Sequence, residues 1–135
     1  MDRNQAEKAI EYWSKSAEYD LGVADSLLEK EKYHYSLFFG HLALEKILKA
    51  IYVRNTSDQA PVTHSLPLLA QKSGLHPDGI RLEKLAEFME FYIEGRYPRE
   101  LETVYRKYDR SFAMKKLEEI KEMFQWLEKK LSTLP

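Results

Sequence analysis

The stretch "HLALEKILKA", residues 41–50, lies in the most apolar segment of the chain and decides the fold. Over residues 33–54, apolar side chains point in nearly every direction around a helix. A helix that is apolar almost all round is typically enclosed by other helices. The sequence therefore predicts a central helix over 33–54. The polar residues His41, Glu45 and Lys49 within it require a separate explanation.

The segment before the central helix predicts an antiparallel partner. Over residues 4–30, apolar side chains recur every three or four positions and form one stripe along a helix. Asp20 falls inside that stripe, although it carries a charge. The short polar connection "EKEKYHY" requires the chain to fold back, so the two helices are expected to lie side by side.

Three further helices are predicted after the central one. "THSLPLLAQKSG" predicts a short helix, with Thr63 or Ser65 as its N-cap and Gly74 as its stop. Asp78 is placed to cap a helix over residues 80–94. Ser111 is expected to cap the last helix, whose apolar stripe continues to the C-terminal region.

These elements predict an all-α fold. We expect an up-and-down antiparallel four- to five-helix bundle with one short extra helix. The 135 residues are enough to bury a core, and no repeat or linker divides them, so residues 1–135 are expected to form a single domain. No strand with a period of two is predicted.

Composition argues against several classes of function. Lys and Arg total 21 against 22 Asp and Glu, which is not the basic excess typical of proteins that grip long nucleic acids. Cysteine is absent, and the four histidines include no His-x-x-x-His pair, so neither a metal site nor a cofactor is expected. No apolar run approaches a membrane span and no signal-peptide core is present, which predicts a cytoplasmic protein without membrane contact.

The polar residues of the central helix form a row, because His41, Glu45 and Lys49 are spaced four apart. One interpretation is an ordinary ion pair between Glu45 and Lys49 beside a core histidine. The other is a polar pocket that also contains Asp20, since a buried carboxylate needs a partner. His41, Lys46 or an arginine could supply that partner.

A second candidate site lies in "GRYPRELETVYRKYDR", residues 95–110, the one locally basic and aromatic stretch. Arginine can bind phosphate with two parallel hydrogen bonds, and a tyrosine ring can stack on a base. Arg96, Tyr97 and Arg99 are therefore candidate ligand-binding residues. Alternatively, the tyrosines fill the bundle while the charges face solvent.

Three stretches together resemble the HEPN domain family (higher eukaryotes and prokaryotes nucleotide-binding). They are "YWSKSAEYDLGVADSLLEKEKYHYSLFFGHLALEKILKAIYV", then "THSLPLLA", then "EGRYPRE", in order and over nearly the whole chain. The resemblance implies a helical bundle that commonly forms homodimers. It also implies a group often encoded beside a minimal nucleotidyltransferase, sometimes as a toxin–antitoxin pair.

Many members of that family are metal-independent ribonucleases with an arginine followed by a polar residue and a histidine. Here no histidine follows any arginine by five to seven positions, so no catalytic residue is expected. The leading hypothesis is a non-catalytic module that binds a nucleotide, RNA or a nucleotidyltransferase partner. The alternatives are a ribonuclease with an atypical site at His64, and a purely structural bundle used for dimerisation or docking.

The binding hypothesis gives each candidate residue a role. Arg96 and Arg99 would hold phosphate, Tyr97 would stack a base, and Lys49 would add positive charge. The remaining candidates, His41, Glu45 and Asp20, would order the pocket wall or bond the sugar of the ligand.

Overall fold

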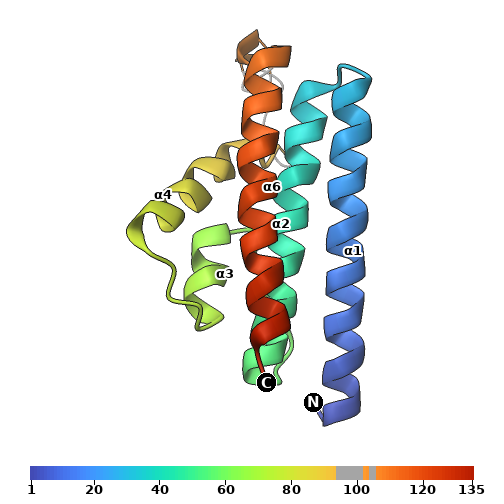
Figure 1. The fold of residues 1–135 in the computed structure, drawn as a ribbon, viewed down its shortest axis with the longest axis vertical. Helices are drawn as coiled ribbons and strands as arrows, with labels where there is room; N and C mark the ends of the chain where they lie inside the picture. Colours follow the sequence, from blue (N-terminus) through green and yellow to red (C-terminus); the bar gives the residue numbers. More distant parts are fainter. Residues whose placement is uncertain (94–101, 104–105) are drawn as a thin grey trace.

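The computed structural model describes residues 1–93, 102–103 and 106–135, and within these ranges it contains helices and no strand. Figure 1 shows three long helices side by side, with shorter helices on one flank. The elements are α1 (Arg3–Glu29), α2 (Tyr33–Thr56), α3 (Leu66–Lys72), α4 (Gly79–Phe88), the 3-10 helix η1 (Met89–Phe91) and α6 (Arg110–Thr133). The predicted all-α bundle is confirmed.

Among the described helices, α1 and α2 share the most extensive contact. Asp2 and Gln5 cap α1 reciprocally, because each side chain accepts a hydrogen bond from the other residue's backbone amide, at 2.8 and 3.0 Å. Buried alanines, among them Ala17 and Ala24, allow the two backbones to approach closely. The Ser36 hydroxyl on α2 donates to the Ala24 carbonyl at 2.7 Å, which fixes one helix against the other.

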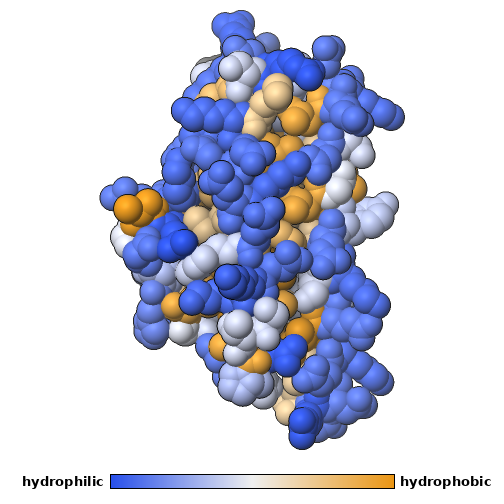
Figure 2. Space-filling view, in the orientation of Figure 1, coloured by the Kyte–Doolittle hydropathy of each residue, from blue (hydrophilic) through white to orange (hydrophobic). Residues whose placement is uncertain are grey.

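Helix α2 is central, as its apolar sequence predicts. Leu37, Leu44, Leu48 and Ile51 are fully buried between α1, α3 and α6. A Cβ added at Gly40 would lie 2.9 Å from Ile120 on α6, so glycine permits the close approach of these two helices. Figure 2 shows apolar side chains in the seam between α6 and the α1–α2 pair, and hydrophilic ones over the outer face of α6.

The short helix α3 has the predicted boundaries. Ser65, one of the two proposed caps, accepts a hydrogen bond from the Leu68 amide at 3.3 Å. Pro67 lies in the first turn, where its missing amide hydrogen costs no helical bond. Gly74 adopts a φ of +80°, which glycine tolerates without strain, and the helix ends before it at Lys72.

Helix α4 lies next to α3 and reaches α6 through long side chains. Asp78 caps it as predicted, because its carboxylate accepts from the Arg81 amide at 2.8 Å. Lys84 reaches Glu119 on α6 at 2.7 Å. The Arg81 guanidinium lies over the ring of Trp126, 4.2 Å from its centroid.

Two predicted boundaries are wrong. The helix predicted over 80–94 is α-helical only as far as Phe88. The 3-10 turn η1 follows it and places Phe91 in the core. The cap of α6 is Asp109 and not Ser111, since the Asp109 carboxylate accepts from the Phe112 amide at 2.8 Å. Asp and Ser are both good N-caps, and Asp109 lies only two residues before Ser111.

Candidate functional site

The predicted polar row of α2 meets a histidine from the following loop. Glu45 lies between Lys49 and His64, with Oε2 at 3.2 Å from Lys49 Nζ and Oε1 at 2.9 Å from His64 Nδ1. His41 is adjacent, with Nε2 at 3.9 Å from the same Oε1. We call His41, Glu45, Lys49 and His64 the Glu45 cluster.

The backbone explains why these residues meet. The row faces one side of α2, and Ser57 ends that helix in the left-handed conformation, with a φ of 59°. The loop then returns along α2, so that His64, directly before the cap of α3, reaches Glu45. Glu45 and Lys49 are buried, whereas the side chain of His64 is 49% exposed. The cluster therefore opens to solvent at His64.

Aromatic rings border the Glu45 cluster. The ring of Tyr92, just after η1, stacks on His64 with 4.4 Å between centroids and 21° between planes. The Lys49 ammonium lies 5.1 Å from the ring centroid of Trp13 on α1. The sequence pattern predicts neither contact, because each joins residues that are far apart in the chain.

His41 has an unusual environment. It is fully buried, and neither ring nitrogen has a hydrogen-bond partner among the described residues. Burial, and then the charge of His64, lower the pKa of His41 from its ordinary value of 6.5 to about 3. The ring is therefore neutral near pH 7, with one nitrogen able to donate and the other able to accept.

Asp20 is part of a separate pair. Its carboxylate lies 2.7 Å from Lys46 Nζ, one of the partners that the sequence proposed. Lys46 also donates to the Ser16 hydroxyl at 2.8 Å, which ties α2 to α1. Asp20 thus pairs with Lys46 and not with His41, so the single polar pocket predicted from the sequence is divided into two groups.

The basic stretch of residues 95–110 is only partly described. Arg96, Tyr97 and Arg99 lie outside the described residues. Tyr108 is buried in the core, and its hydroxyl lies 3.1 Å from Glu90. For Tyr108, the alternative in which the tyrosines fill the bundle is therefore correct.

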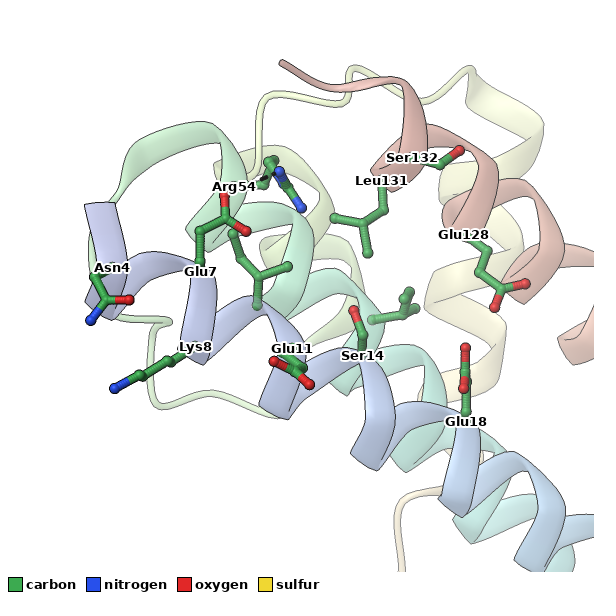
Figure 3. A pocket seen from close by; sticks show the side chains of 12 residues that line it. Asn4, Glu7, Lys8, Glu11, Ser14, Glu18, Arg54, Glu128, Leu131 and Ser132 are labelled. Atoms are coloured by element: carbon green, nitrogen blue, oxygen red, sulfur yellow. Dashed lines mark ion pairs between the residues drawn. The ribbon is translucent and has the colours of Figure 1, made fainter. Parts of the chain in front are cut away.

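A groove of about 660 Å³ runs along α1 and α6, and no residue of the Glu45 cluster lines it. Figure 3 shows Glu18 and Glu128 facing each other across it. Burial, and then the neighbouring Glu18 carboxylate, raise the pKa of Glu128. Glu7 and Glu11 add two more carboxylates to its lining. Because this acidic surface repels phosphate, the groove is a poor site for a nucleotide.

Two other kinds of site receive no support from the described ranges. They contain no group of three or more His, Cys, Asp or Glu side chains that could hold a metal ion. None of the helices in the same ranges is both long and apolar enough to cross a bilayer.

Comparison with known proteins agrees with this fold. The model of the HEPN domain family matches residues 10–130. The crystal structure of TT1696 from Thermus thermophilus is similar, with a TM-score of 0.74 and 22% sequence identity. The match covers 90% of this chain and 97% of that one. At this identity, the likeness to TT1696 concerns the fold alone. No curated protein matches the chain.

Proposed function

This chain belongs to the HEPN domain family, and on that premise we propose that it is a non-catalytic module that binds a nucleotide at the Glu45 cluster. One observation carries the proposal. His64 is half exposed and stacks on Tyr92. It contacts Glu45, which also pairs with the buried Lys49. This arrangement places cationic and aromatic groups together, as binding of a phosphate and a base requires.

The chemistry assigns a role to each group. The Lys49 ammonium and the His64 ring are donors for a phosphate, and they lie on opposite oxygens of Glu45. Tyr92 offers a ring face beside them. Arg96, Arg99 and Tyr97 complete the proposal as further phosphate and stacking groups. Asp20, held by Lys46, stiffens the neighbouring helix pair and takes no direct part.

Calorimetric titration with ATP tests this function. Specific binding is expected to be saturable and to persist when salt rises from about 50 to about 200 mM, because contacts in a half-buried cluster are less screened than surface contacts. An absence of heat, or heat that disappears with salt, contradicts nucleotide binding. It would favour the purely structural alternative, in which the polar row only stabilises the bundle.

A ribonuclease with an atypical site is the second candidate function. The observation in its favour is the His64–Glu45 contact at 2.9 Å, because a carboxylate that orients an accessible histidine is a common general-base arrangement. This candidate predicts metal-independent RNA cleavage that His64→Ala abolishes. If a nuclease-free, chelator-treated preparation leaves RNA intact, the ribonuclease candidate is rejected.

Partner proteins form a separate part of the proposal. We infer a homodimer and a minimal nucleotidyltransferase partner, of the toxin–antitoxin kind, from membership in the family. Tyr12 and Tyr19 on α1 are 63% and 74% exposed and provide aromatic surface of the type enriched at interfaces. Analytical ultracentrifugation tests the homodimer, and a dimer that Tyr19→Glu dissociates would support this surface. A monomer at all concentrations would contradict the homodimer.

A further inference from the structure

His41 belongs to the Glu45 cluster but is neither a phosphate donor nor a stacking ring in the proposed nucleotide site. It is 0% exposed, and neither Nδ1 nor Nε2 has a hydrogen-bond partner among the described residues. Buried polar side chains are nearly always hydrogen-bonded, because an unpaired one costs free energy that an apolar residue would not. A histidine in this state, in the middle of the central helix, requires a physical reason.

The reason lies in the oxygen that two histidines share. Glu45 Oε1 is 2.9 Å from His64 Nδ1 and 3.9 Å from His41 Nε2. Only the contact with His64 is within hydrogen-bond distance. Because His41 is four residues before Glu45 on the same helix, a small rotation of the carboxylate would bring it to His41 instead.

We propose that Glu45 is a latch with two positions, a closed one that holds His64 and Lys49 and an open one that bonds His41. In the open position, the carboxylate accepts a hydrogen bond from His41 Nε2. His64 and Lys49 are then free to bind an anion at the mouth of the cluster. That the anion is the phosphate of a nucleotide rests on the proposed function, whereas the latch itself does not.

Each of the two positions leaves different groups of the cluster without a partner in the described part of the chain. The closed position keeps two contacts of Glu45 but leaves His41 unpaired among the described residues. The open position gives up those contacts and satisfies His41. Tyr92 stacks on His64 and lies 5.2 Å from His41, so its ring can follow either arrangement. A phosphate that replaces the carboxylate on Lys49 and His64 would shift the balance to the open position.

The first experiment needs no ligand. NMR relaxation dispersion on the backbone amides of residues 57–65 would report millisecond opening of the loop that carries His64. We expect exchange in the wild type and an open population about fivefold lower in His41→Leu, because the carboxylate then loses its second partner. His34→Leu, two turns earlier on α2, is the matched control and should leave the exchange unchanged.

The second experiment uses the unmodified protein and so does not depend on whether His41→Leu folds. Nitrogen-15 NMR of the histidine side chains would show the His41 Nε2 proton becoming hydrogen-bonded as ATP is added. A third experiment, calorimetry on the two variants, should find that His41→Leu binds ATP about fivefold more weakly than His34→Leu.

The outcomes separate the latch from the proposed function. An absence of loop exchange in the wild type, or equal exchange in His41→Leu, overturns the latch even if ATP binds. If ATP does not bind while His41→Leu suppresses the exchange, the latch stands and the nucleotide proposal fails. If ATP binds while the His41 signal does not change, the latch is overturned and nucleotide binding stands.

Discussion

Two carboxylates of this bundle are almost equally buried but are held in different ways. Asp20 on α1 is 6% exposed and Glu45 on α2 is 4% exposed. Among the described residues, Asp20 has one cationic partner, Lys46, which joins the two helices. Glu45 lies between Lys49 and His64, and His41 competes for one of its oxygens. A carboxylate with one partner serves stability, whereas one with several competing partners can exchange them.

Of the single substitutions, removal of Lys46 should have the largest effect on stability near pH 7, because it breaks the simpler arrangement. In Lys46→Ala, Asp20 stays buried without its cation, and the free energy of unfolding should fall by about 2–3 kcal/mol. Urea denaturation measures this fall. In Asp20→Asn, no unpaired buried carboxylate remains, so this variant should lose less. A loss below about 0.5 kcal/mol in Lys46→Ala would mean that the pair behaves as an exposed one.

Acid should lower the free energy of unfolding through His41, which lies next to Glu45. Because folding lowers the pKa of His41 from 6.5 to about 3, the unfolded chain binds a proton between these pH values that the folded chain does not. The free energy of unfolding is therefore independent of His41 protonation above pH 6.5, and it falls as the pH decreases from 6.5 towards 3. The slope should approach about 1.4 kcal/mol per pH unit.

Denaturation at several pH values, in parallel on the wild type and on His41→Leu, isolates this contribution from that of the carboxylates. In the variant, the free energy of unfolding should depend less steeply on pH, by the equivalent of about one bound proton. Identical slopes in the two proteins would mean that His41 is not held neutral by the fold.

A change of Glu45 to glutamine should have a smaller effect on stability. The amide oxygen can still accept from Lys49 or His64, so Glu45→Gln should cost about 1 kcal/mol. Because glutamine is not an anion and no longer competes with the phosphate for Lys49 and His64, affinity for ATP should rise. Calorimetry and denaturation of the same sample test both statements. Lower affinity with unchanged stability would contradict the competition between Glu45 and the ligand.

The sequence predicted the long helices well, because their apolar patterns depend on local periodicity. The position of Asp20 within an apolar stripe was enough to predict a buried pair, with Lys46 among the candidate partners. The division into two polar groups was not predictable, because His64 reaches Glu45 through a loop whose path no periodicity encodes. The position of Tyr92 was missed for a related reason, since a 3-10 turn of three residues leaves no pattern.

The two tryptophans allow the most direct test of the claim that the Glu45 cluster is the ligand site. Trp13 lies beside Lys49, whereas Trp126 lies under Arg81 in the α4–α6 contact. In an NMR titration with ATP, we expect the indole signal of Trp13 to shift to saturation while that of Trp126 stays fixed. Equal shifts of both signals, or a shift of Trp126 alone, would contradict binding at the Glu45 cluster.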